Sequence, residues 1–310
     1  MKIMIFGAGG VGGYFGARLA AGGRDVTFIA RGPHLDALRK HGLKLESPLG
    51  DLHLPEVFAT DDVGEALGGG AGDTDVVMVC VKLWDIEAAG TALAPALSPE
   101  ATVIPFENGV DAPQRLAAIL GKDRVMGGSA HISARIAKPG VISHNGKLAK
   151  IFFGEMGSGK SMRGKAFAAA CEAAGVAARL TSNIEHVTWE KFIFLVAFSG
   201  MTAMRRQPIG PLRDNPENWA MFLAAMGEAA ALAEARGVTF REDPVQAWLP
   251  RMEAMPDSYQ ASMLEDLEHG RRLELPWLSG AVVRLGAETG METPANSAIV
   301  EALTPFAEGA

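Results

Sequence analysis

The sequence has few cysteines and no excess of positive charge. Its 310 residues contain only two cysteines, Cys80 and Cys171, too few for a disulfide framework, so we expect a reducing compartment. Lysines and arginines number 29 against 36 aspartates and glutamates, which gives a net charge of −7. A nucleic-acid-binding protein needs a basic face to displace phosphate counterions. The charge therefore argues against that class and favours a protein that handles small molecules.

Long apolar runs and an N-terminal leader are also missing. The apolar run from Phe192 to Phe198 is too short to span a bilayer, and a structured motif begins by Gly7, which leaves no room for a signal peptide. We therefore expect no membrane partner and a cytoplasmic location. The histidines show no metal-ligand spacing, and His131 and His144 are expected to be structural. The common motifs of zinc proteases and serine hydrolases do not occur.

The patterns of expected strands and helices divide the chain into two parts, as its length leads us to expect. Short apolar strands alternate with helical patterns in the first part, with strands expected at 2–6, 25–31, 75–81, 101–106 and 124–130. This alternation is typical of a parallel sheet with helices on both faces. Helices are expected in the second part at 184–204, 217–236, 244–255, 258–270 and 276–289. We predict an α/β domain over residues 1–180 and an all-helical domain over residues 181–310.

Three segments of the first part depart from the simple alternation. Residues 43–59 alternate apolar and polar side chains around a Pro-Leu-Gly-Asp turn, which predicts an inserted hairpin. Residues 64–73 are rich in glycine and are expected to form a surface loop. Residues 140–154 are predicted to extend the parallel sheet with an antiparallel strand.

A glycine-rich motif lies between the first expected strand and the first expected helix. Its pattern is G-x-G-x-x-G, formed by Gly7, Ala8, Gly9, Gly10, Val11 and Gly12. In a dinucleotide-binding fold the first glycine permits a tight turn, the second lets the backbone approach a pyrophosphate, and the third allows close helix–strand packing. A plain strand–helix turn is the alternative. The position of the motif favours a Rossmann-type, doubly wound sheet with these residues binding the cofactor.

The end of the second strand predicts which cofactor binds. NAD-type sites place a carboxylate about 20 residues after the glycines to bond the ribose 2′-hydroxyl. Arg31 occupies that place, and the nearest following carboxylate in the sequence is Asp36. An arginine can bind a 2′-phosphate with charge-assisted hydrogen bonds, so we expect NADP(H). A solvated surface arginine is the alternative.

Polar residues follow the next two strands at the edge where open sheets bind ligands. Lys82 follows the strand at 75–81, and Asn108 follows the strand at 101–106. We expect Lys82 to contact the cofactor and Asn108 to contact the cofactor or the substrate. Surface loop residues, or a helix cap for Asn108, are the alternatives.

Two ionisable residues of the helical part lie in apolar surroundings. Lys191 precedes the run from Phe192 to Phe198, and partial desolvation would lower its pKa towards the range useful for proton transfer. A lysine that snorkels to water is the alternative. Glu274 lies between two leucines and could position Lys191 or a substrate hydroxyl, although an acid at a helix start would have the same sequence context.

The ordered set of motifs resembles the ketopantoate reductase (2-dehydropantoate 2-reductase) family over nearly the whole chain. The segments that carry the resemblance are "FGAGGVGGYFGARL", "VK.W", "ENGVD", "GGSAHISAR", "WEKF", "SML.DL..GR.LEL" and "LSGAVVRLG". The resemblance implies a 6-phosphogluconate dehydrogenase-like fold with the active site in the cleft between the domains. By the same resemblance Lys191 is the general acid, Glu274 the active-site glutamate and Ser262 a substrate-binding serine. Arg31 would contact the 2′-phosphate of NADPH, with Lys82 and Asn108 beside the reacting carbon.

The sequence departs from the family on the helix that carries Lys191. The family has asparagines four and eight residues after its catalytic lysine, where this chain has Leu195 and Ser199. Residues with this spacing share a helix face, so we expect Ser199 to contact the substrate. Pro276 and Ser279 also replace usual polar residues. Such changes alter hydrogen bonding to a polar substrate and therefore its selection.

Together these features predict reduction of a small 2-oxo acid by NADPH. The leading assignment is 2-dehydropantoate to pantoate, a step of pantothenate biosynthesis. The alternatives are a related reductase for a more apolar 2-oxo acid or ketone, and a nonenzymatic NADP(H)-binding sensor. The apolar, Met-rich helical part is compatible with a homodimer.

Overall fold

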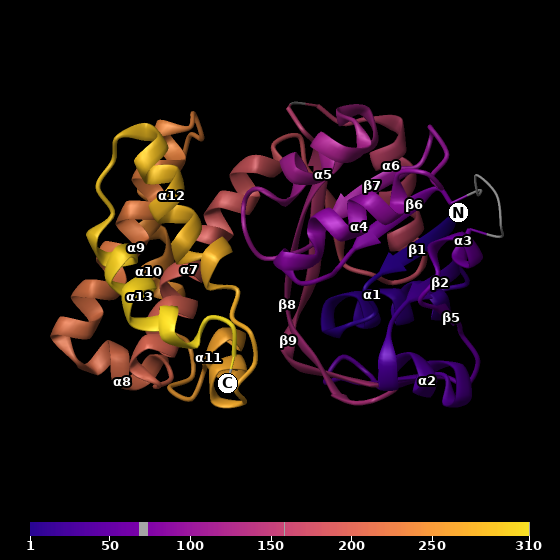
Figure 1. Cartoon of the computed structure of the whole chain (residues 1–310), viewed down its shortest axis with the longest axis horizontal. Coiled ribbons are helices and arrows are strands. Elements are labelled where there is room, and N and C mark those ends of the chain that lie inside the picture. Colours follow the sequence, from indigo (N-terminus) through magenta and orange to yellow (C-terminus); the bar gives the residue numbers. More distant parts are fainter. Residues whose placement is uncertain (68–73, 158, 310) are drawn as a thin grey trace. The chain divides into compact units, whose positions relative to one another are not determined.

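The protein is described by a computed structural model that covers residues 1–67, 74–157 and 159–309. The chain forms two compact units, Met1–Glu185 and His186–Ala310. Figure 1 shows that the first unit combines strands and helices and that the second is built from helices. The predicted fold class, a Rossmann-type parallel sheet followed by an all-helical domain, is confirmed.

A five-stranded parallel sheet forms the centre of the first unit, in the order β5-β2-β1-β6-β7. Its strands are β1 (Lys2–Phe6), β2 (Asp25–Ile29), β5 (Phe58–Thr60), β6 (Val76–Val79) and β7 (Thr102–Pro105). The helices between them are α1 (Gly10–Ala21), α2 (Gly32–His41), α3 (Val63–Ala66), α4 (Ile86–Leu93) and α5 (Ala112–Leu120). Every residue of β6 and β7 is buried, as expected for parallel strands covered on both faces. The strand order reverses beside β1, and open sheets bind their ligands outside the carboxyl ends of the strands at such a point.

A second sheet accompanies the first, in the order β10-β9-β3-β4, with β8 paired to β9. Its strands are β3 (Leu43–Glu46), β4 (Leu52–Leu54), β8 (Met126–Lys138), β9 (Val141–Glu155) and β10 (Ala178–Leu180). The predicted hairpin is confirmed, because β3 and β4 pair antiparallel. The predictions that a strand at 124–130 belongs to the parallel sheet and that residues 140–154 extend it are wrong, because β8 and β9 belong to the second sheet. Register shifts after Ile132 and Ile136 interrupt the β8–β9 ladder, and such bulges bend a strand.

The segment predicted as a glycine-rich loop begins as helix α3. Asp62 caps this helix by accepting a hydrogen bond from the Glu65 N–H. The rest of the predicted loop, residues 68–73, lies outside the described residues. Helix α6 (Met162–Ala173) completes the first unit and was not predicted from the sequence.

The described residues of the second unit form the five predicted helices and two more. The predicted ones are α7 (Ile184–Arg205), α9 (Pro216–Ala235), α10 (Pro244–Glu253), α11 (Ser262–Glu268) and α12 (Ser279–Thr289). The additional helices are α8 (Ile209–Asp214) and α13 (Pro294–Leu303). Helix α8 was not predicted because prolines flank it: Pro208 is its N-cap, and Pro216 begins the next helix. Proline is favoured in the first turn of a helix as well as after its end.

Helix α7 is long and apolar enough, at 22 residues, to cross a membrane. The expectation that no segment reaches this length is therefore wrong. Within its most apolar window 67% of the residues are buried inside the protein, however, and Ile193 and Val196 are fully buried. This burial is typical of the core helix of a folded domain.

The start of α13 is held by a carboxylate from α9. Glu228 accepts hydrogen bonds from the Ala295 N–H at 2.6 Å, the Asn296 N–H at 2.9 Å and the Asn296 side-chain amide at 2.7 Å. The first N–H groups of a helix have no partner inside the helix, so this carboxylate acts as a cap from another element.

Replacing Glu228 by alanine is expected to lower the free energy of unfolding by about 2–3 kcal/mol, because three donors lose a charged acceptor. Urea unfolding of the variant beside wild type measures this change. Glu234→Ala on the exposed side of the same helix is the control and is expected to change stability by less than about 0.5 kcal/mol. Equal effects of the two substitutions would contradict the capping role.

Candidate active site

The five parallel strands end in register, and this brings the predicted cofactor residues to one edge of the sheet. The last residues of the strands pair across the sheet in the order Thr60, Ile29, Phe6, Val79 and Pro105. The segments that follow contain Gly7, Arg31, Lys82 and Asn108. Residues far apart in the sequence therefore lie along the edge where such sheets bind ligands.

The three motif glycines differ in the space around them, in the way a dinucleotide requires. Gly7 has φ +105°, and a Cβ there would lie 2.7 Å from the Cys80 carbonyl oxygen. A Cβ on Gly12 would lie 2.2 Å from the Gly7 carbonyl oxygen. A Cβ on Gly9 would meet nothing within 4 Å among the described residues. Gly7 thus makes the turn, Gly12 packs the helix on the strand, and Gly9 leaves the backbone open to a pyrophosphate.

The start of helix α1 also fits a pyrophosphate. Gly9 is its N-cap, and the first turn of this fully described helix carries no acidic residue. Its N–H groups and dipole can therefore stabilise an anion. Gly10 has a different place, because a Cβ there would lie 2.1 Å from the Ala134 carbonyl oxygen of β8. Val11 packs partly buried against the core, and Ala8 donates its N–H to the Ile29 carbonyl oxygen at 2.9 Å.

Arg31 begins helix α2 and forms an ion pair that the sequence did not predict. Its Nη2 lies 2.5 Å from Oδ2 of Asp85, which is 54 positions further along the chain. The Arg31 side chain is 78% exposed and that of Asp85 25% exposed. A carboxylate therefore does lie beside Arg31, although none follows it closely in the sequence. Spacing arguments could not have found it, because two separate strand ends bring the residues together.

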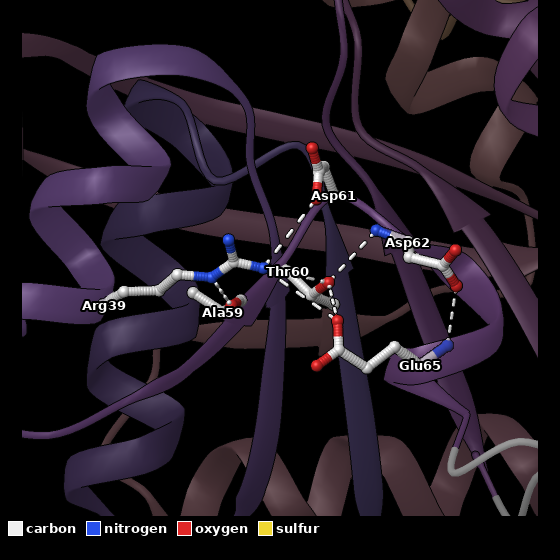
Figure 2. A network of polar contacts seen from close by, with 6 residues as sticks. All are labelled: Arg39, Ala59, Thr60, Asp61, Asp62 and Glu65. Carbon is white, nitrogen blue, oxygen red and sulfur yellow. Dashed lines mark hydrogen bonds and ion pairs between the residues drawn. The ribbon is translucent and has the colours of Figure 1, made fainter.

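A second arginine of α2 fixes the neighbouring strand end (Figure 2). Arg39 donates from Nε to the Ala59 carbonyl oxygen at 3.0 Å, and its Nη2 lies 3.7 Å from Asp61 and 3.9 Å from Glu65. The Thr60 hydroxyl donates to the Glu65 carboxylate. Because the Thr60 carbonyl oxygen accepts from the Ala30 N–H at 3.0 Å, this network also holds the backbone just before Arg31.

Lys82 and Asn108 follow β6 and β7 in loops that a buried glutamate connects. Glu107 accepts a hydrogen bond from the Val81 N–H at 3.0 Å, which ties the two loops together. Lys82 is half-buried, with its Nζ 5.6 Å from the centre of the Trp84 ring, and Asn108 is half-buried as well. Burial raises the pKa of the Cys80 thiol, and the nearby Glu107 charge raises it further. This cysteine is therefore a neutral core residue rather than a nucleophile.

In the second unit, Lys191 lies on α7 with buried aromatic neighbours. Trp189 and Phe192 are 2% and 1% exposed. Lys191 is half-buried as a residue, but burial around its ammonium group lowers the pKa from 10.5 to about 8. The negative charge of Glu274 opposes this shift without cancelling it. Glu274 is itself buried and precedes a short 3₁₀ turn, Leu275–Trp277.

Lys191 is also the single lysine between His186 and Ala310; the other strongly basic residues there are arginines. An arginine side chain does not give up its proton in proteins, whereas a desolvated lysine does. Among these basic side chains the lysine is therefore the one suited to proton transfer near neutral pH.

The other predicted substrate contacts of the second unit differ in accessibility. Leu195 is half-buried, Ser199 is 2% exposed, and Ser262 is exposed at the first position of α11. Ser279 is fully buried, and its Oγ has no hydrogen-bond partner within the part of the chain that is described.

The two histidines expected to be structural pack against other side chains. Nδ1 of His144 lies 2.8 Å from Oγ of Ser47, and its ring meets the Tyr14 ring at 4.8 Å. The ring of His131 lies 4.9 Å from that of Phe152.

Comparisons with known proteins agree with this arrangement. The family model "Ketopantoate reductase PanE/ApbA" matches residues 3–158, and the model "Ketopantoate reductase PanE/ApbA C terminal" matches residues 183–307. A 2-dehydropantoate 2-reductase of Mesorhizobium japonicum is 30% identical over 97% of this chain and 96% of its own length.

Solved structures show the same similarity. A PanE/ApbA family ketopantoate reductase from Ralstonia eutropha JMP134 is 31% identical, with a TM-score of 0.89 over 99% of this chain and 98% of that one. A D-mandelate dehydrogenase solved with NADH and anilino(oxo)acetate shares the fold, with a TM-score of 0.87 over 99% of this chain and 98% of that one, at 20% identity. The two family models cover most of the sequence, so the chain belongs to the ketopantoate reductase family PanE/ApbA and is an oxidoreductase of that family.

Proposed function

We propose that this protein reduces a small 2-oxo acid to the 2-hydroxy acid with NADPH, and that 2-dehydropantoate is its leading substrate. The observation that carries the proposal is Lys191, a lysine with a pKa of about 8 near a buried glutamate, in a chain that also has an open dinucleotide turn. A general acid works best when its pKa lies near the operating pH. Family membership supports the same reaction class.

The chain's residues divide the work between binding and proton transfer. The N–H groups at the start of α1 and the open backbone at Gly9 hold the pyrophosphate, and Arg31 holds the 2′-phosphate. A bound nicotinamide cofactor supplies the hydride. Lys191 gives a proton from Nζ to the carbonyl oxygen of the substrate as negative charge develops there. Glu274 keeps part of the positive charge on the lysine and holds it in place.

The remaining predicted residues orient the substrate. Asn108 follows β7 at the cofactor edge and can donate a hydrogen bond to the nicotinamide amide or to the substrate, and Lys82 adds a positive charge there. Ser262 and Ser199 supply hydroxyl groups from the helical unit. A reaction of this kind suits a cytoplasmic enzyme of pantothenate biosynthesis, acting as a homodimer.

A second candidate function is reduction of a more apolar 2-oxo acid. It is favoured by Leu195, which stands one helical turn from Lys191 where the resembling family has an asparagine. Phe198 continues this side of α7 and stacks on Tyr259 with ring centres 5.4 Å apart. A hydrocarbon side chain of a substrate would gain from such surroundings, whereas a hydroxyl group would lose hydrogen bonds.

Oxidation of NADPH across a panel of 2-oxo acids tests both candidates. Followed by absorbance, the wild-type protein is expected to oxidise NADPH with 2-dehydropantoate and to leave it unchanged without substrate. Turnover that occurs only with acids bearing larger apolar side chains would favour the second candidate. Tight binding of NADPH with no turnover across the panel would contradict both and indicate a sensor.

A further inference from the structure

The carboxylate of Asp85 makes a contact that is unusual for a residue at a helix N-cap. Asp85 is the N-cap of α4, where an aspartate ordinarily bonds the free N–H groups of the first helical turn. In this described segment its side chain makes no such bond, and Oδ2 lies 2.5 Å from Nη2 of Arg31 instead. The Asp85 N–H donates to the Lys82 carbonyl oxygen at 2.8 Å, which fixes the backbone of this turn. The carboxylate is thus held across β1 from its own strand end, beside the guanidinium.

The pair combines both kinds of ribose recognition at one place. An arginine after the second strand binds a 2′-phosphate, and a carboxylate near that position accepts a hydrogen bond from a 2′-hydroxyl. Arg31 supplies the first group from α2, and Asp85 supplies the second from the turn after β6. An NAD-type site has the carboxylate after the second strand itself, so a sequence comparison of that strand alone would miss it.

We propose that Asp85 is a cofactor-selecting residue, which weakens NADPH binding by competing for Arg31 and supports NADH binding by accepting a hydrogen bond from the ribose 2′-hydroxyl. This inference rests on the proposed binding of a nicotinamide cofactor at the glycine turn. With Arg31 and Asp85 together, the pair carries no net charge, so a 2′-phosphate meets one attractive and one repulsive group. Without the phosphate, the carboxylate is an acceptor that the hydroxyl can use.

The exposure of the pair makes the competition feasible. With the Arg31 side chain 78% exposed, water screens the attraction between the two groups. Phosphate binds a guanidinium through two parallel hydrogen bonds and carries more charge than a carboxylate, so it can displace Asp85. Asparagine at position 85 would keep the size of the side chain but remove its charge.

Asp85→Asn is therefore expected to move the two cofactors in opposite directions. We expect NADPH to bind about three- to tenfold more tightly and NADH about three- to tenfold more weakly than in wild type, as single charged hydrogen bonds allow. In Arg31→Ala, NADPH should bind at least tenfold more weakly. In the Arg31→Ala background, Asp85→Asn should increase the affinity for NADPH by less than it does in wild type, because there is no guanidinium for the substitution to release.

Dissociation constants from fluorescence titration of the purified full-length chain with NADPH and with NADH test the proposal without any turnover. The matched control is Asp36→Asn, which removes the charge of an exposed carboxylate on helix α2. It is expected to leave both constants within twofold of wild type. The melting temperature of Asp85→Asn should match that of wild type, because an exposed ion pair adds little stability.

The outcomes separate this inference from the proposed function. Parallel shifts of both cofactors in Asp85→Asn, or no shift, would overturn the selecting role. Opposite shifts together with no turnover on any 2-oxo acid would support the role of Asp85 while contradicting the proposed reaction. If wild type bound neither cofactor, both proposals would fail.

Discussion

Replacing Lys191 by alanine is expected to lower kcat on the best 2-oxo acid by about 10²- to 10⁴-fold, the range that a positioned general acid contributes. The alcohol product needs a proton on its oxygen, and Lys191, the single lysine of the helical unit, has a pKa that lets it release one near neutral pH. Cofactor titration of the variant should give the wild-type dissociation constant, because the glycine turn and Arg31 belong to the first unit. Stopped-flow absorbance of NADPH measures the chemical step.

The matched variants separate proton transfer from positive charge. Lys191→Arg keeps the charge but releases no proton, so its activity should fall almost as far as that of the alanine variant. Arg251→Ala on α10 removes an exposed cation that lies 3.2 Å from Glu190, the neighbour of Lys191 on α7, and its activity should stay within about twofold of wild type. An arginine variant with near-wild-type activity would show that Lys191 acts as a fixed charge.

The pH dependence gives a second measure of the same group. An acid acts in its protonated form, and burial lowers the pKa of Lys191 to about 8. The rate kcat/KM is therefore expected to be constant on the acid side of this value and to fall as the pH rises above about 8. This limb should vanish in the residual activity of Lys191→Ala. A limb that persists unchanged in the variant would assign it to another group.

Because its pKa is lowered, the charged form of Lys191 destabilises the folded protein. A substitution that removes this charge should therefore raise stability although it removes activity. In the unfolded chain the lysine binds its proton up to about pH 10.4, so near pH 9 the unfolded state holds more protons than the folded state. Stability due to this group is thus lowest below pH 8 and rises between about pH 8 and pH 10. Lys191→Met keeps the length of the side chain without the charge and should raise the unfolding temperature at pH 7.

Features of the fold that depend on local patterns could be predicted from the sequence. The buried strands β6 and β7 are short apolar runs between helical segments, and the turn from Gly7 to Gly12 has the spacing of a dinucleotide-binding motif at the junction of a strand and a helix. Helix α8 was missed because its prolines indicate helix starts and helix breaks equally well. The second sheet was misjudged because β9 has the same composition whichever sheet it joins, and composition does not show that its partners are β3, β8 and β10.

In the candidate site, too, contacts between segments distant in the sequence could not be predicted. Arg31 follows its strand at the expected distance from the glycines, so its place at the sheet edge could be predicted. Its partner Asp85 could not, because their contact depends on two strand ends that adjoin β1 from opposite sides. Asp85 is the N-cap of α4, and only the folded arrangement shows that its carboxylate turns to the arginine.

The second large effect is expected at the glycine turn, where Gly12→Ala and Gly9→Ala add the same methyl group in different surroundings. Gly12→Ala would place its Cβ 2.2 Å from the Gly7 carbonyl oxygen and 2.7 Å from Ile5, so helix α1 must move away from β1. We expect the free energy of unfolding to fall by about 3 kcal/mol, the upper part of the usual range for overpacking, because the blocking atom is backbone. Urea unfolding followed by circular dichroism measures the loss.

Gly9→Ala adds the same methyl group where a Cβ meets no described atom within 4 Å, so it serves as the matched control for stability. Its free energy of unfolding should stay within about 1 kcal/mol of wild type, the cost of alanine at an N-cap. Cofactor binding should nevertheless weaken at least tenfold, because the methyl group occupies the side on which the backbone meets the pyrophosphate. Stability and binding would thus be lost separately at two glycines three residues apart. Wild-type affinity in Gly9→Ala would mean that the pyrophosphate does not lie against this turn, and the cofactor site would have to be sought elsewhere along the sheet edge.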